Sequence, residues 1–116
     1  MTLCLTRAEP GRWFFDMTET GRTVGRCDLR ANPKDEKNGH LGFLVFPEER
    51  GKGYAKEACR QMLVFAKEKG LTGLTASCRE ENAASARVIE AVGGRLIAAR
   101  DGVRIYEIEG SSASKN

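Results

Sequence analysis

Clustered metal-binding and disulfide-forming residues are missing from this sequence of 116 residues. Its four cysteines, Cys4, Cys27, Cys59 and Cys78, are widely spaced and form no C-x-x-C pair. This spacing argues against a zinc site and against a disulfide framework, so we expect no bound metal. Reduced thiols that pack as small hydrophobic side chains indicate a cytoplasmic protein.

The sequence also lacks a long apolar run and a strong charge of one sign. No segment approaches the roughly 20 apolar residues of a membrane-spanning helix, and Arg7 and Pro10 interrupt any signal-peptide pattern. The net charge of +3 is too small to predict a nucleic-acid partner. We therefore expect neither a membrane nor a nucleic-acid partner, but one domain over residues 1–110 and a disordered polar tail at 111–116.

Two common phosphate-binding motifs are absent as well. No window fits the Walker A pattern, and the dinucleotide pattern G-x-G-x-x-G fails because Lys56 stands at its third glycine. What is present is the run Arg50 to Ala55, Arg-Gly-Lys-Gly-Tyr-Ala, between the apolar segment 41–46 and a helical pattern. A strand, a glycine-rich turn and a helix N-terminus in this order gather backbone N–H groups and bind phosphate.

The remaining patterns predict strands first and helices later. A change of parity in the second strand marks a bulge at Gly25. The segment 41–46 is apolar on both faces, which predicts a central strand covered on both sides. The predicted elements are strands at 13–17 and 24–29 around a turn at 19–22, a polar loop at 31–39, a helix from the glycine-rich turn to about Lys69, a strand at 74–78, a helix from Asn82 to Gly93-Gly94, and a hairpin of 96–99 with 103–108.

Two motifs in this order resemble one enzyme family. Arg50-x-x-Gly53-x-Ala55 resembles the acetyl-CoA pyrophosphate loop of the GNAT superfamily of N-acetyltransferases, and Asn82-x-x-Ser85 before a short helix resembles its later motif. The resemblance covers about residues 12–109 and is strongest to a branch of predicted and ribosomal-protein acetyltransferases. It implies an α/β (α+β) fold with a mixed, mostly antiparallel sheet and two main flanking helices. It also implies acetyl-CoA as cosubstrate and an amine as acceptor.

The resemblance further implies where acetyl-CoA would bind. The strand before the loop splays from its neighbour in this family, so Leu44, Val45 and Phe46 would pair with the pantetheine amides, and one N–H would support the oxyanion. The residues implied to hold the diphosphate are Arg50, Gly51, Lys52, Gly53, Tyr54 and Ala55. For the Lys52 side chain, a solvated loop charge is an equal alternative.

Three other residues are candidates for binding and catalysis. Asn82 either caps its own helix or bonds the cofactor arm, and both readings stay open. By resemblance Ser85 lies near the departing sulfur as an acid or thiolate stabiliser, unless it only bonds locally in the helix. His40 is the candidate general base because its ordinary pKa of about 6.5 suits proton transfer, although strict alternation puts it on the opposite face from Val45.

The sequence departs from the family in two places. Ile89 stands where many members carry a tyrosine that acts as general acid, so protonation must rely on Ser85, on water or on neither. The family's first strand is followed by two helices that wall the acceptor site, but too few residues precede Trp13 to form them. The acceptor site is then open or completed by a second subunit, and we expect a homodimer that joins around Trp13 to Met17.

The sequence therefore favours an acetyl-CoA-dependent N-acetyltransferase in which an amine, on a small molecule or a protein, attacks directly. We expect no acetyl-cysteine, because Cys78 shares an apolar stripe with Leu74 and Ala76. The alternative is a non-catalytic acyl-CoA-binding or assembly module, which the missing tyrosine and helices favour. A third hypothesis is a nucleotide-phosphate-binding protein of another class.

Overall fold

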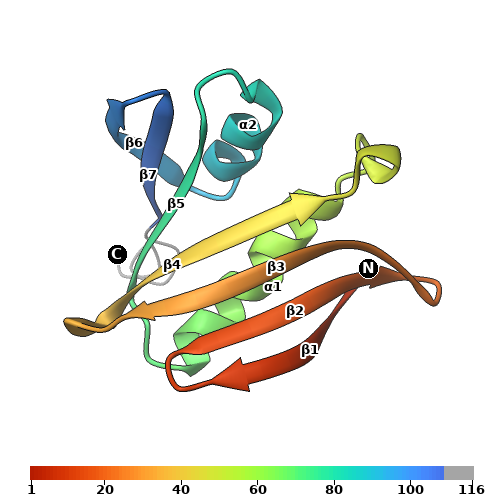
Figure 1. The fold of residues 1–116 in the computed structure, drawn as a ribbon, viewed down its shortest axis with the longest axis horizontal. Coiled ribbons are helices and arrows are strands. Elements are labelled where there is room, and N and C mark those ends of the chain that lie inside the picture. Colours follow the sequence, from red (N-terminus) through yellow and green to blue (C-terminus); the bar gives the residue numbers. More distant parts are fainter. Residues whose placement is uncertain (109–116) are drawn as a thin grey trace.

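The structure, a computed structural model, describes residues 1–108 as a seven-stranded sheet with two α-helices (Figure 1). The strand order is β1-β2-β3-β4-β5-β7-β6, and among the described strands only β4 and β5 pair in parallel. The elements are β1 (Thr2–Glu9), β2 (Arg12–Glu19), β3 (Arg22–Asn32), β4 (Asp35–Val45), η1 (Pro47–Glu49), α1 (Tyr54–Glu68), β5 (Gly73–Arg79), α2 (Ala83–Ala91), β6 (Gly94–Arg100) and β7 (Val103–Ile108). The mostly antiparallel sheet with two main helices confirms the predicted fold class. The tail predicted at 111–116 lies outside the described residues.

The sheet is split between β4 and β5. These strands pair only from Asn38 with Gly73 to Leu41 with Ala76. Beyond that point β4 continues to Val45 and β5 to Arg79, and Figure 1 shows the two strands diverging. The split lies directly before the glycine-rich loop, where the resemblance places a splayed strand.

One face of β1–β4 packs on α1 (Figure 1). The rings of Trp13 and Phe15 meet Phe65 of α1 edge to face, with centroids 5.7 and 5.0 Å apart. Met17 is fully buried in the same layer. Of the apolar side chains that we expected at a dimer interface around Trp13 to Met17, Phe15 and Met17 are buried in the core, Trp13 is half-buried against α1, and Phe14 is half-buried on the opposite face. Dimerisation itself stays a prediction.

No helix of residues 1–108 covers the opposite face of β1–β4 (Figure 1). Leu44 of β4 is 54% exposed on this face, so the prediction of a strand covered on both sides is wrong. The apolar composition of 41–46 led to this wrong prediction because the Leu44 side chain faces a cavity, described below, rather than the core. Strands β1 and β2 are joined by a turn at Pro10-Gly11, which leaves no helix pair between them.

Two other segments differ from the sequence prediction. Residues 31–39 form the ends of β3 and β4 with a turn at Pro33-Lys34, rather than a loop. Their polar composition misled because most of this end of the hairpin is exposed, so few apolar residues are needed. The sequence reasoning missed β1, whose side chains are almost all exposed at the sheet edge. Within the described residues, no helix has the length and apolarity that crossing a membrane requires.

The bulge predicted at Gly25 is confirmed. Met17 pairs with Gly25 and Thr18 with Thr23, so Val24 is the extra residue of β3. A Cβ atom on Gly25 would lie 2.5 Å from the carbonyl oxygen of Leu44, and 2.9 Å from the Met17 sulfur. Glycine is needed here because the neighbouring backbone leaves no room for a side chain.

Candidate functional site

A cavity of about 440 Å³ lies where the end of β4, the glycine-rich loop, α1 and α2 meet. It brings together nine of the residues that the sequence predicted for the site: Leu44, Val45, Arg50, Gly51, Gly53, Tyr54, Ala55, Asn82 and Ser85. Phe46, Lys52 and His40 do not line it.

The end of β4 presents backbone donors to the split. The N–H of Phe46 donates to the carbonyl of Val24 on β3 at 2.9 Å. Backbone polar groups alternate in direction along a strand, so the N–H groups of Phe43 and Val45 point the other way, towards the diverged β5. The donors available to a ligand are therefore those of Phe43 and Val45, and the Phe46 donor is already used within the sheet.

The loop before α1 leaves the helix N-terminus uncapped by any side chain. Gly51 and Gly53 have φ angles of +82° and +84°, a left-handed conformation that favours glycine. The first helical bond runs from the N–H of Glu57 to the carbonyl of Gly53 at 3.2 Å, and Gly53 has no side-chain cap. The N–H groups of residues 54–56 precede that bond and remain for a ligand, supported by the helix dipole.

An ion-pair network holds this loop against the turn between β2 and β3. The Nε and Nη2 atoms of Arg22 donate to the carboxylate of Glu49 at 3.1 and 2.8 Å, and the Nζ of Lys52 donates at 3.0 Å. These hydrogen bonds lower the pKa of Glu49 from 4.5 to about 2, and the bond from Arg22 has the largest effect. Lys52 is thus engaged by Glu49, while Arg50 lines the cavity and donates from Nε to the carbonyl of Val45 at 3.1 Å.

Helix α2 brings Asn82 and Ser85 to the other wall of the cavity. The Oδ1 of Asn82 accepts from the N–H of Ser85 at 3.0 Å, so Asn82 caps α2. That bond leaves the Nδ2 group of Asn82 and the hydroxyl of Ser85 for other partners. Ile89, at the position of the family's tyrosine, is fully buried, and a Cβ on Gly94 would lie 2.5 Å from its Cγ2.

Two cations that the sequence reasoning missed also line the cavity. They are Lys56, in the first turn of α1, and Arg87, on α2. Helical spacing carried a signal for Arg87, because Ala84, Val88 and Ala91 recur on one helix face beside it. With Arg50, these side chains make the cavity suitable for an anionic ligand.

His40 lies away from this cavity. Its Nδ1 is 2.8 Å from the Oγ1 of Thr75 on β5, in a hydrogen bond. His40 precedes Leu44 by four residues on β4, which corresponds to roughly 13 Å along a strand. Burial, and then the charge of Arg30, lower the pKa of His40. The structure therefore places the candidate base outside the lining and favours its neutral form at pH 7.

The four cysteines are free thiols. Burial raises the pKa of Cys27 and of Cys59 to about 12. Burial also raises the pKa of Cys78, against the opposing charge of Arg104. In residues 1–108, no three histidine, cysteine or acidic side chains are placed to hold a metal ion.

Several solved structures of acetyltransferases have the same fold. The GNAT domain of S. lividans PAT is 19% identical with a TM-score of 0.78, over 85% of this chain and 61% of that one. The putative acetyltransferase yncA from Salmonella typhimurium, solved with its cofactor acetyl-CoA, is 18% identical with a TM-score of 0.75, over 86% and 65%. A variant of spermidine N-acetyltransferase SpeG from Vibrio cholerae is 18% identical with a TM-score of 0.76, over 90% and 69%.

These likenesses establish the fold, and a family model establishes the family. The chain spans less than two thirds of the first two structures' chains. No curated protein sequence matches it significantly. The model of the acetyltransferase (GNAT) domain matches residues 3–95, which is most of the chain. The chain therefore belongs to the GNAT acetyltransferase family.

Proposed function

We propose that the chain is an acetyl-CoA-dependent N-acetyltransferase. The observation that carries this proposal is the split between β4 and β5, which leads directly into the uncapped N-terminus of α1. Strand-like N–H groups at Phe43 and Val45 suit an arm that contains amides, and the helix N-terminus suits a diphosphate. Coenzyme A joins these two parts in one molecule. Family membership, and the acetyl-CoA in the yncA structure, support the same ligand.

The residues of the cavity divide the work of binding. Bound acetyl-CoA would supply an acetyl group activated as a thioester. The N–H groups of residues 54–56, with Arg50 and Lys56, would hold the diphosphate. Val45 would donate its N–H to a carbonyl oxygen of the bound arm or to the acetyl oxygen, where negative charge develops during transfer. Asn82 would donate from Nδ2 while its Oδ1 caps α2.

Transfer would proceed by direct attack of a free amine on the acetyl carbon. The new N–C bond forms as the C–S bond breaks, the amine loses a proton to water, and the sulfur gains one. Ser85 would donate a hydrogen bond to the departing sulfur, because it lines the wall opposite β4. The buried Ile89 and the raised thiol pKa values support this route over a tyrosine acid or an acetyl-cysteine.

Release of CoA in the presence of amines tests the proposal. The assay would offer acetyl-CoA with peptides, lysine analogues and diamines, and follow both free thiol and product mass. Amine-dependent release supports an acetyltransferase. Tight CoA binding without release for any amine would favour the non-catalytic acyl-CoA-binding module. Two observations are consistent with that alternative: Ile89 replaces the family's tyrosine acid, and no helix of the described residues covers the open sheet face. Tighter binding of ATP or NAD than of CoA would contradict both.

A cytoplasmic homodimer is the remaining part of the proposal. The four free thiols support a reducing compartment. The dimer has less support than the sequence suggested, because the outward side of β2 carries Phe14 beneath the guanidinium groups of Arg7 and Arg12 rather than an open apolar patch. Sedimentation equilibrium measures the molecular mass directly, and a monomer mass at tens of micromolar would contradict the homodimer.

A further inference from the structure

The open face of β1–β4 holds a second cavity, of about 630 Å³. It meets the first one at Phe43 and Leu44, which line both. Asp28 of β3 pairs in register with Gly42 of β4. Its Oδ1 lies 2.8 Å from the place where a Cβ atom on Gly42 would be. The missing side chain of Gly42 therefore lets the Asp28 carboxylate lie directly beside β4, close to the split.

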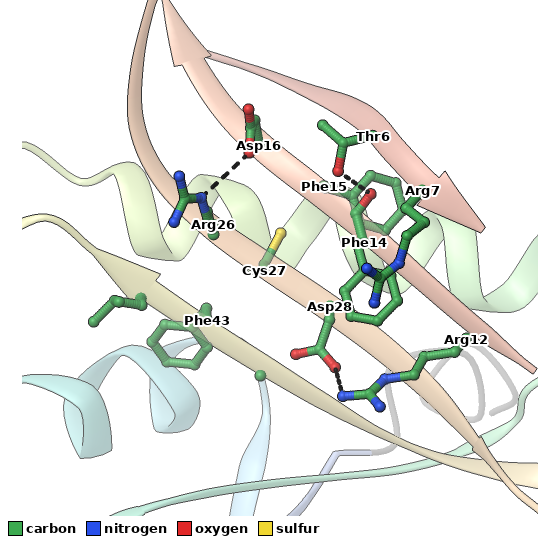
Figure 2. A pocket seen from close by; sticks show the side chains of 12 residues that line it. Thr6, Arg7, Arg12, Phe14, Phe15, Asp16, Arg26, Cys27, Asp28 and Phe43 are labelled. Carbon is green, nitrogen blue, oxygen red and sulfur yellow. Dashed lines mark hydrogen bonds and ion pairs between the residues drawn. The ribbon is translucent and has the colours of Figure 1, made fainter. Parts of the chain in front are cut away.

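The carboxylates of this cavity retain hydrogen-bonding capacity. Figure 2 shows Asp28 directed towards Arg12, and Asp16 towards Arg26. The N···O distances are 3.7 and 3.6 Å, which is too long for hydrogen bonds. The Arg12 guanidinium instead lies over the ring of Phe14, 4.8 Å from its centroid. Asp28 can therefore accept hydrogen bonds from the N–H groups of an amine.

Two arginines and the neutral His40 form a row beside Asp28 on the same face. Arg12 pairs in register with Arg30, and Arg30 with His40, so the three residues share one row across β2, β3 and β4. Like charges directly opposite each other destabilise a sheet. Asp28 partly offsets the charge of Arg12 at 3.7 Å, but within the described part of the chain no carboxylate lies within 4.0 Å of the Arg30 guanidinium. An anion on this row would therefore be bound favourably.

We propose that this face binds the acceptor as a polypeptide, with its amine against Asp28 and a nearby acidic side chain on the row of Arg12 and Arg30. The two rows are two residues apart, or about 7 Å. In an extended peptide, that distance separates an amine from the carboxylate of the next residue or the one after it. A free amino acid carries its two charges too close together, and a polyamine would bring a second cation to the arginines. The inference rests on the proposed function, because it names the acceptor of the same site.

A peptide series tests the charge arrangement. Three fluorescent peptides would differ only at position two, with Glu, Gln or Lys, and carry no other charge besides a free N-terminus. A fourth, with a blocked N-terminus, would place an internal lysine beside a glutamate, which separates an α-amine from a lysine amine. Anisotropy with CoA present measures binding, and CoA release is measured separately. We expect the Glu peptide to bind about fivefold tighter than the Gln peptide, and the Lys peptide weakest.

Two variants and one control sharpen the test. Arg30→Glu should reverse the ranking, so that the Lys peptide binds best. Asp28→Asn should weaken every peptide by about tenfold through loss of a charged hydrogen bond, with a raised KM and unchanged CoA affinity. Arg100→Glu is the matched control, because Arg100 is exposed on β6 and should leave the ranking as it is.

The outcomes separate this inference from the proposed function. Equal binding of the three peptides, or an unchanged ranking in folded Arg30→Glu, would overturn the inference. Faster acetylation of free amino acids or diamines than of any peptide would also overturn it. If the predicted ranking is found but no amine is acetylated, the inference stands and the enzymatic proposal fails.

Discussion

The two faces of β1–β4 are made by the same strands but differ in what they contribute. Towards α1, Phe15, Met17, Leu29 and Leu41 are at most 5% exposed, and their burial stabilises the fold. The other face carries ion pairs at 3.6–3.7 Å, and such exposed pairs contribute roughly 0–1 kcal/mol each. Because the residues of this face contribute little to folding stability, they can serve ligand binding instead. In this chain the face adjoins the candidate acetyl-CoA cavity.

Changes of single glycines should show the largest contrast between the faces. A Cβ at Gly25, on the core side, meets the backbone oxygen of Leu44 at 2.5 Å, whereas a Cβ at Gly42 meets the end of the Asp28 side chain at 2.8 Å. Moving the backbone of β4 would cost considerable free energy, whereas the Asp28 carboxylate can rotate away at little cost. Urea unfolding should therefore show a loss of about 3 kcal/mol for Gly25→Ala and within about 0.5 kcal/mol for Gly42→Ala. Equal losses would contradict the contrast.

The next effect concerns turnover on the α2 side of the cavity. Ser85→Ala should slow acetyl transfer on the order of 10- to 100-fold by weakening support for the departing thiolate, with CoA affinity nearly unchanged. Cys78→Ala is the control and should stay within a few-fold of the parent rate. An acetyl adduct on Cys78, seen by intact-mass spectrometry with acetyl-CoA alone, would refute direct transfer.

Thiol labelling compares the faces through their cysteines. Cys27 and Cys59 lie in the core with pKa values raised to about 12, whereas Cys4 on β1 is exposed. An alkylating reagent at neutral pH should label Cys4 rapidly, and the two core thiols only when the fold opens. Mass spectrometry over time gives the order, and simultaneous labelling of all three would show that the core is not closed as described.

The smallest effect should come from the loop network of Glu49. Because its pKa is lowered from 4.5 to about 2, its ion pairs stabilise the fold above pH 4.5 and lose their contribution as the pH falls towards 2. The parent should therefore have a slightly higher Tm than Glu49→Gln at pH 7, and the difference should shrink between pH 4.5 and 2. A difference that does not change with pH would assign the effect to packing instead.

The glycine-rich loop and the helix starts could be predicted because their causes are local. Gly51 and Gly53 adopt positive φ angles that favour glycine, and Asn82 caps the helix it precedes. These requirements act within a few residues of the chain. They leave a signal in the sequence that can be recognised without knowledge of the partners in space.

The open-face cavity could not be predicted because its cause is not local. The position of the Asp28 carboxylate depends on the neighbouring Gly42, and the unfavourable charge at Arg30 depends on the neighbouring Arg12. Both pairs are brought together by strand register. A shift of one residue would move all these side chains to the other face. The available N–H groups of Phe43 and Val45 likewise depend on where β5 diverges, which no single segment encodes.

Calorimetry with CoA tests the central claim most directly. Gly53→Asp would place a carboxylate beside the proposed diphosphate, and Gly53→Asn is the matched control because it has nearly the same shape at the same φ of +84° without the charge. We predict CoA affinity at least about tenfold weaker for the Asp variant than for the Asn variant, as expected when charged hydrogen bonds are lost. Equal CoA affinity of the two folded variants would show that the diphosphate does not bind at this helix N-terminus.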